Sequence, residues 1–271
     1  MILKRWFISA VACPLIFAVA TNVGARTLPA SEPGVQVSFS IPQSTVTLNE
    51  PAYLLFVVRN GTGRETTVYL GKNNTAGFRF TITDSTGKIT HAPQAGAAGA
   101  GAWGKVLVDA GRSYAQDLLV NEWYHFDKPG NYKIEVELIE HALREPEKVL
   151  RTWVSGKMEL TVLPRNPQRL DAVCRKLILT ALSVSNYPAA SEAALALSYV
   201  QDPVALPYLG QLLAGGNSLS PTAIRGLVRI GTPQAVSILE SHLATSDTLL
   251  RSLIRSAVEE IKTGIHPTVE D

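Results

Sequence analysis

Two copies of one helical unit lie 30 residues apart, and this repeat limits the possible folds more than any other feature of the chain. The segment AALALSYVQDPVALPYLGQLL (193–213) aligns with AIRGLVRIGTPQAVSILESHL (223–243). Apolar residues and prolines recur at matching positions: Leu197 with Leu227, Val200 with Ile230, Pro203 with Pro233, Ala205 with Ala235, Leu209 with Leu239, and Leu213 with Leu243. A weaker third copy places Ile254, Arg255 and Val258 under Ile224, Arg225 and Val228. A period of this size is typical of stacked helix pairs, each of which cannot bury its apolar face alone.

The apolar pattern over the second half of the chain predicts a series of helices. They are expected at residues 169–182, 188–200, 203–213, 221–230, 233–243 and 247–262. Four of them open on proline, which suits the first helical position because its missing N–H would be unpaired there. Asp202, Thr232 and Asp247 precede three of the helices and are expected to cap them.

The segment from Ala189 to Ile261 resembles the HEAT-like repeat, in the short form also called the phycobilisome-lyase-like repeat. The resemblance rests on a small-apolar helix, a Gly/Asp-Pro break and an Ala-x-x-x-Leu helix, followed by Asp247 and, four residues later, Arg251. It implies a short α-solenoid over residues 169–264 whose surface contacts another protein. The family name includes chromophore lyases, but nothing in this sequence carries that chemistry over.

The first half of the chain alternates apolar and polar residues with period two, which predicts β-strands. Strands are expected at 35–41, 53–57, 78–82, 118–126, 132–138 and 149–162, separated by turn signals such as Asn60-Gly61 and Pro129-Gly130. Many short strands without intervening helices favour an antiparallel sandwich over residues 35–163. A Pro-rich linker at 164–168 then leads into the helices, and residues 265–271 form a tail.

The segments EPAYLLFVVRN (50–60) and FDKPGNYKIEVEL (126–138) resemble strands of an immunoglobulin-like or macroglobulin-like domain. The resemblance covers most of 35–163 and implies a β-sandwich. The sequence has neither the Cys pair of antibody domains nor a thioester motif, so no activity is carried over. The expected fold class is therefore a multidomain β + α chain: an antiparallel immunoglobulin-like β-sandwich followed by a short α-solenoid of HEAT-like helix pairs.

The N-terminus has the features of a secretory signal peptide at residues 1–20. Lys4 and Arg5 precede an apolar stretch that ends at Ala20, the expected cleavage site, with Ala25 as the alternative. The stretch is shorter than the about 20 residues that span a bilayer, although a membrane anchor is the competing interpretation. Cys13 loosely matches a lipoprotein motif, but apolar sequence continues after it. We expect export to the periplasm or the extracellular space, with a small-residue and Pro-rich linker at 21–34.

Removing residues 1–20 leaves 23 Lys and Arg against 23 Asp and Glu, because the only charges removed are Lys4 and Arg5. A neutral chain lacks the positive charge expected of a protein that binds nucleic acid or anionic membranes. Beyond the signal peptide, we expect no nucleic-acid binding and no membrane span.

Catalytic motifs are missing from the sequence. The five histidines are scattered, no HExxH or GxSxG motif occurs, and Cys174 is the lone cysteine after Cys13. GAGAWGK (99–105) has the spacing of a phosphate-binding loop, but Val106 follows where Ser or Thr is required. Glu122 and Asp127 are expected on opposite faces of a strand, which does not suit a glycosidase pair. We therefore expect no enzyme activity, no cofactor and no metal.

The candidate binding residues fall in three groups. Trp103 sits in a Gly/Ala-rich segment that favours a flexible loop displaying an aromatic side chain. Trp123 and Tyr124 lie in the cluster NEWYHFD (121–127) and could stack on a sugar, although inward packing is the simpler interpretation. Arg225, Arg229 and Arg255 could line a stripe for an acidic partner, or they could belong to a solvated face.

The sequence thus favours an exported, non-catalytic interaction or scaffold protein whose partner is another envelope or extracellular protein. A carbohydrate-binding or cell-wall-binding module that uses Trp103, Trp123 and Tyr124 is the first alternative, and its partner would be a glycan. A protease-inhibitor-like role, implied by the macroglobulin resemblance, is the second.

Overall fold

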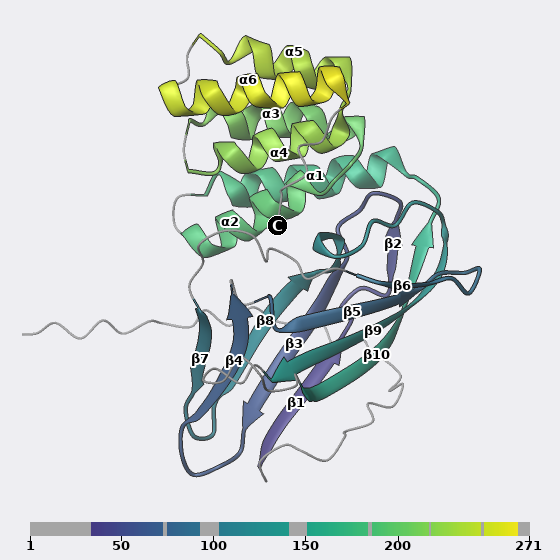
Figure 1. Ribbon diagram of the computed structural model, residues 1–271, viewed down its shortest axis with the longest axis vertical. Helices are drawn as coiled ribbons and strands as arrows, with labels where there is room; N and C mark the ends of the chain where they lie inside the picture. The colour runs from purple at the N-terminus through teal and green to yellow at the C-terminus, as the bar shows by residue number, and fades with distance from the viewer. Residues whose placement is uncertain are drawn as a thin grey trace, which may run out of the picture.

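The computed structural model describes residues 34–72, 75–92, 103–140, 151–183, 186–216, 218–244 and 247–264. β-strands form the first part of the described chain and helices the second (Figure 1). The expected signal peptide at 1–20, the linker before Gly34 and the tail at 265–271 lie outside the described residues.

The strands assemble into three sheets within the described part of the chain. The strands are β1 (Val35–Ser40), β2 (Thr45–Thr47), β3 (Tyr53–Asn60), β4 (Thr66–Lys72), β5 (Phe78–Thr83), β6 (Ile89–His91), β7 (Trp103–Val108), β8 (Ser113–Leu119), β9 (Gly130–Glu140) and β10 (Arg151–Leu163). One sheet has the order β1-β3-β8, the largest has the order β2-β10-β9-β5-β6, and β4 pairs with β7. All pairings are antiparallel except that of β2 with β10, which is parallel.

The predicted fold class, an antiparallel immunoglobulin-like β-sandwich followed by a short α-solenoid, is wrong. The finding that overturns it is the parallel pairing of Thr45 with Thr161, which makes the largest sheet mixed, together with the division into three sheets. Two backbone hydrogen bonds flank the parallel pairing: the Thr161 N–H donates to Ser44 at 2.8 Å, and the Leu48 N–H donates to Leu163 at 3.0 Å. What the structure shows is a layout of strands first and helices second.

The strand predicted at 118–126 is also shorter than expected. β8 ends at Leu119, and a 3₁₀ turn, η1 (Val120–Glu122), follows. The Val120 N–H donates to the Ala52 carbonyl at 2.8 Å, which draws the chain out of the strand and turns Trp123 into the core. The apolar residues in this stretch are therefore buried by a turn and not by a sheet face.

The core of the sheet part is built from the alternating apolar residues and is rich in aromatic rings. Phe56 and Phe78 are fully buried with their ring centroids 5.1 Å apart, and Phe80 lies 4.5 Å from Trp123. Tyr132 is buried at the start of β9, and its hydroxyl donates to the Lys128 carbonyl at 2.7 Å. The β-turn residues before Tyr132 are thereby fixed against the core.

The helices lie within two residues of the predicted bounds, except that the segment predicted as one helix at 203–213 begins with a 3₁₀ turn and becomes α-helical only at Leu206. They are α1 (Pro167–Ala181), α2 (Tyr187–Ser198), the 3₁₀ turn η2 (Pro203–Ala205), α3 (Leu206–Ala214), α4 (Ser220–Ile230), α5 (Pro233–Ser241) and α6 (Thr248–Thr263). The side chains of Asp202, Thr232 and Asp247 each accept a backbone N–H, so all three predicted caps are confirmed.

The helices pack in two layers. α2, α4 and α6 contact one another in sequence along one layer, and α1, α3 and α5 do so along the other. Each helix also contacts its neighbour in the opposite layer, α1 with α2, α3 with α4, and α5 with α6. The leucines that recur in the 30-residue offset, Leu197, Leu227, Leu209 and Leu239, are all fully buried.

The two parts meet at the base of the helical layers, where α1 and α2 lie nearest the sheets and α5 and α6 lie farthest away (Figure 1). The guanidinium of Arg165, in the connecting segment, forms an ion pair with Asp202. Arg169 of α1 reaches back to Glu50, beside β2, with 2.7 Å between Nε and Oε2. These contacts tie the sheets to the first helices.

Candidate functional site: a groove between two helices

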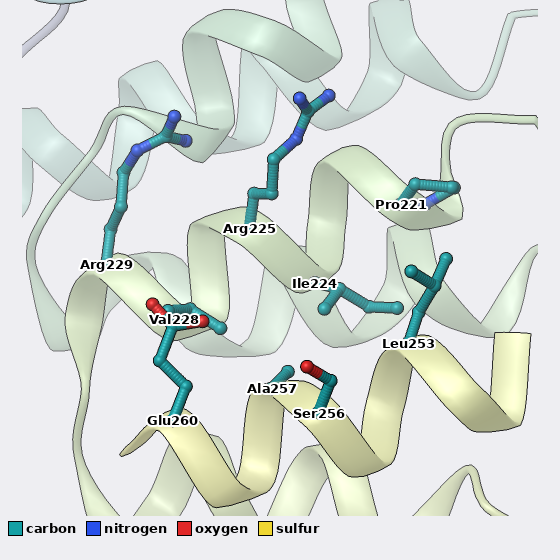
Figure 2. Close-up of a pocket in the computed structure, with 9 residues that line it drawn as sticks. All are labelled: Pro221, Ile224, Arg225, Val228, Arg229, Leu253, Ser256, Ala257 and Glu260. Carbon is teal, nitrogen blue, oxygen red and sulfur yellow. The ribbon is translucent and has the colours of Figure 1, made fainter. Parts of the chain in front are cut away.

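A groove of about 520 Å³ runs between α4 and α6. Its walls are side chains from both helices: Pro221, Ile224, Arg225, Val228 and Arg229 from α4, and Leu253, Ser256, Ala257 and Glu260 from α6 (Figure 2). The two helices are brought together because Ile254 and Ala257 of α6 are buried in the helical core.

The floor of the groove is apolar. Ile224 and Val228 are four residues apart on α4, and Leu253 and Ala257 have the same spacing on α6, so each pair lies on one helix face. Leu253 is 39% exposed, and Leu249, one turn earlier on α6, is 73% exposed. Both leucines are exposed beside an apolar groove. Covering them with another apolar surface would lower the free energy, because it removes apolar area from water.

Arg225 forms the rim on the α4 side. Its side chain is exposed and extends from α4 away from α6 (Figure 2). Its Nη2 donates to the Thr222 hydroxyl at 3.3 Å, and no carboxylate within the described ranges forms an ion pair with it. One guanidinium donor is therefore used in this contact, out of the five N–H donors of an arginine side chain.

Arg229, one turn later, has a structural role. Its guanidinium carbon lies 3.9 Å from the centroid of the Tyr199 ring, and Nη1 donates to the Ser198 hydroxyl and carbonyl at 3.0 and 3.2 Å. Burial lowers the pKa of Arg229, and the nearby charge of Arg225 lowers it further. Arg229 thus ties α4 to the end of α2 and adds positive charge next to Arg225.

Arg255 does not belong with the other two arginines. It is exposed on α6, but it does not line the groove. Arg225 and Arg229 share one rim, whereas Arg251 and Arg255 share a different face of α6 because they are four residues apart. The stripe expected from the sequence is therefore limited to Arg225 and Arg229.

The aromatic candidates do not form a common binding face. Trp123 is 5% exposed and packs on Phe80, so its ring is not available for stacking at the surface. The Tyr124 ring packs edge-on against Phe126 at 5.2 Å. Trp103 opens β7, where its backbone pairs with Lys72, and its side chain lies outside the described residues.

A second cavity, of about 410 Å³, lies at the junction of the two parts and was missed by the sequence analysis. It is lined by β-part residues that include Tyr53, Asp117 and Glu122, and by α1 and α2 residues that include Lys176 and Glu192. The one available signal was Glu192, which is the only acidic residue in the small-apolar helix α2. Its counterpart Asp117 gave no signal, because a polar residue is ordinary in an alternating strand.

Three of the carboxyl groups that line this junction cavity have a raised pKa, and burial is the main cause in each. Burial raises the pKa of Asp117, and it raises the pKa of Glu192 with a further contribution from the charge of Asp117. Burial also raises the pKa of Glu122, while the charges of Arg229 and Arg225 oppose that rise. Asp117 and Glu192 belong to different parts of the chain, so their repulsion acts across the junction.

The catalytic candidates considered from the sequence are not brought together. Cys174 is fully buried in the helical core, and burial raises its pKa to about 12, so its thiol stays protonated near neutral pH. Glu122 lines the junction cavity, whereas Asp127 is exposed on the surface of the sheet part. Across the ranges that the structure describes, no three His, Cys, Asp or Glu side chains gather as metal ligands do. In the same residues, no helix has the length and apolar character needed to span a bilayer.

Comparisons with known proteins leave the family of this chain open. No protein-family model matches the chain, and no curated protein matches it significantly. A β-glucosidase from Listeria innocua in complex with isofagomine superposes with a TM-score of 0.29 and 12% identity, over 48% of this chain and 16% of the glucosidase. An alkylpurine DNA glycosylase from Pseudomonas fluorescens gives a TM-score of 0.25 and 11% identity, over 48% of this chain and 30% of that one.

A sporulation control protein from Bacillus subtilis gives a TM-score of 0.28 and 9% identity, over 55% of this chain and 54% of that protein. Superpositions this weak carry no argument about fold or activity. The resemblance to HEAT-like repeats therefore stays a prediction.

Proposed function

We propose that this chain is a non-catalytic interaction protein that binds another protein through the α4–α6 groove. The observation that carries the proposal is the exposure of Leu249 and Leu253 beside an apolar floor, with a positively charged rim at Arg225. A protein interface with an apolar centre and a polar or charged edge has this composition. Alanine scans place most of the binding energy of an interface in a few residues near its centre, and arginine is enriched among them.

The glycan-binding alternative loses two of its three expected residues. Stacking on a sugar needs an exposed ring, but Trp123 is buried and Tyr124 packs on Phe126. The protease-inhibitor alternative rests on the macroglobulin resemblance alone, and no groove or loop in the described residues favours it over simple protein binding.

Affinity capture with the whole chain tests the proposal. Three baits are compared in extracts of the cells that produce the protein: the wild type, Leu253→Asp in the groove, and Leu179→Asp on α1. Leu179 is a matched control because it is 69% exposed and does not line the groove. We expect the wild type and the Leu179 variant to retain the same protein in equal amounts, and Leu253→Asp to lose it. Retention of that protein by Leu253→Asp contradicts the proposal.

We further propose that the protein is exported by its first 20 residues and meets its partner in the envelope or outside the cell. The basic N-terminus followed by an apolar stretch that ends at Ala20 supports this. N-terminal sequencing of the protein from cell fractions is the test. An intact Met1 in the cytosolic fraction contradicts export, and a mature N-terminus at Thr21 or Arg26 supports it.

A further inference from the structure

We propose that the partner segment is an amphipathic α-helix that lies along the α4–α6 groove with an acidic residue against Arg225. This inference rests on the proposed function, and it names the chemistry of the partner. Three observations support it: the helical spacing of the floor residues, the hydrogen-bonded backbone of α4 and α6 along the groove, and the positive charge of Arg225 on the α4 edge.

The groove suits a helix because its floor is made of residues with helical spacing. The ridges of α4 and α6 repeat every four residues, at Ile224 and Val228 on one side and at Leu253 and Ala257 on the other. Side chains of a third helix fit between such ridges when they recur at the same interval. The stretch from Pro221 to Val228 is about 10 Å long at 1.5 Å per residue, so about two turns of a partner helix cover it.

A strand is a poorer occupant for the same groove. An added strand binds chiefly through main-chain hydrogen bonds to an open sheet edge. Beyond Pro221, which has no N–H, the groove residues lie inside α4 and α6, where the N–H and C=O groups bond within their own helix. The groove therefore offers side chains and not backbone groups to a partner. A helix suits such a groove, because its own N–H and C=O groups are already hydrogen-bonded within the helix.

The charge on the α4 edge of the groove favours an acidic partner residue at that edge, whereas Glu260 lines the α6 side. Arg225 is exposed and donates a 3.3 Å hydrogen bond to the neutral Thr222 hydroxyl. Burial lowers the pKa of Arg229, and the nearby charge of Arg225 lowers it further. Arg229 is held by Tyr199 and Ser198, so its positive charge stays at this edge. A carboxylate that contacts Arg225 would add to the attraction that Glu122 already exerts on both arginines, and it could accept two hydrogen bonds from the guanidinium.

The apolar floor argues against a polyanion such as a nucleic acid. A phosphate backbone that reached Arg225 would lie against Ile224 and Leu253, which offer it neither charge nor hydrogen bonds. An acidic amphipathic helix satisfies both the floor and the rim.

A displayed peptide library tests the inference directly. Its peptides carry fixed leucines at positions i, i+4 and i+7 of an Ala-rich helix, and the flanking positions vary among Glu, Asp, Lys, Arg, Ser and Ala. The library is selected on the whole chain in three forms: the wild type, Arg225→Glu, and Arg255→Glu. Arg255 is the matched control, because it is an exposed arginine outside the groove.

We expect the wild type and Arg255→Glu to enrich Glu or Asp on one flank of the leucine face, and Arg225→Glu to enrich Lys or Arg at the same flank. The best wild-type peptide should bind Arg225→Glu about three- to tenfold more weakly, and its Glu→Lys version should recover that loss. A proline placed at the centre of the peptide should abolish binding because it breaks the helix.

Two results overturn the inference. The first is that the selected peptides show the same flank charge, or none, whether residue 225 is Arg or Glu. The second is that peptides with a central proline bind as tightly as those without it. If either occurs while capture of a protein still depends on Leu253, this inference fails and the proposed function stands. If capture does not depend on Leu253, the proposed function itself fails.

Discussion

The guanidinium of Arg169, on the first helix, holds the carboxylate of Glu50, beside β2, through bonds of 2.7 Å to Oε2 and 3.2 Å to Oε1. Glu50 is only 5% exposed and also accepts the Thr47 N–H at 2.8 Å. Arg169 donates in addition to the Thr45 carbonyl at 2.8 Å. This arginine thus joins the edge of the mixed sheet to the helical layers, and it compensates a carboxylate that is almost completely shielded from water.

Removing Arg169 should destabilise the protein well beyond the usual effect of a surface ion pair. We expect Arg169→Ala to lower the free energy of unfolding by about 2–4 kcal/mol, because it leaves the Glu50 carboxylate buried without its cation. Urea unfolding measures the loss. The matched control is Lys157→Ala, whose ion pair with Glu135 is exposed and should contribute less than about 1 kcal/mol. Equal losses in the two variants contradict a special role for Arg169.

Trp123 should matter for folding and not for ligand binding. Its ring is buried against Phe80, so Trp123→Ala should lower the free energy of unfolding by about 3–5 kcal/mol. The Trp123 indole N–H has no hydrogen-bond partner in the described structure, so Trp123→Phe loses only packing and should cost about 1–2 kcal/mol. Thermal unfolding distinguishes the two substitutions. Glycan binding that disappears in Trp123→Phe while stability is retained argues against this assignment.

Two glycines inside helices should respond oppositely to alanine. A Cβ at Gly226 would lie 2.8 Å from Leu209 Cδ2 and 2.9 Å from the Ser198 Cα, where α4 approaches α2 closely. We expect Gly226→Ala to lower the free energy of unfolding by about 1–3 kcal/mol, because the clash exceeds the gain in helix propensity.

Gly210 is the control, since a Cβ there would meet only Ile238 Cγ2, at an ordinary 3.4 Å. Gly210→Ala should leave the stability unchanged or raise it by up to about 1 kcal/mol. Denaturant midpoints of the two variants measure the difference. A Gly226 variant as stable as the Gly210 variant contradicts the close approach of α2 and α4.

The junction carboxylates should make stability depend on pH in a defined direction. The pKa of Glu192 is raised, by burial first and then by Asp117, so the folded state binds this proton more tightly than the unfolded state. The folded state therefore gains stability as pH falls through the raised pKa, and the destabilisation is fully present above it. Because Glu192 is exposed, solvent screens the repulsion and we expect a small effect.

Glu192→Gln removes this titration. It should be more stable than the wild type at pH 7, and the difference should shrink toward about pH 5, well above the ordinary pKa of a carboxyl group. Asp202 should stay ionised between pH 5 and pH 7 and so should not disturb the comparison. Burial opposes its ionisation, but hydrogen bonds from Arg165 and the Val204 N–H lower its pKa. Glu259→Gln, on an exposed face of α6, is the control. A difference that grows as pH falls contradicts the repulsion across the junction.

The sequence determined the local structure of this protein to a large extent. Helix starts were predictable because proline and a capping Asp or Thr act on the adjacent residues, as at Asp202-Pro203 and Thr232-Pro233. Alternation identified the strands around Phe56, Phe80 and Ile134, because a two-residue period fixes which side chains share a face. It also separated the strand-rich part from the helical part.

Only the tertiary structure decided how these elements combine. Alternation gives neither the partner nor the direction of a strand, so the parallel pairing of Thr45 with Thr161 was not predictable, nor was the turn at Val120 that buries Trp123. Arg225, Arg229 and Arg255 looked alike in the sequence, because their roles depend on Tyr199 and Leu253, which lie nearby only after packing. The groove and the junction cavity are made of side chains distant along the chain. Their positions follow from long-range burial and not from the conformational preferences of neighbouring residues.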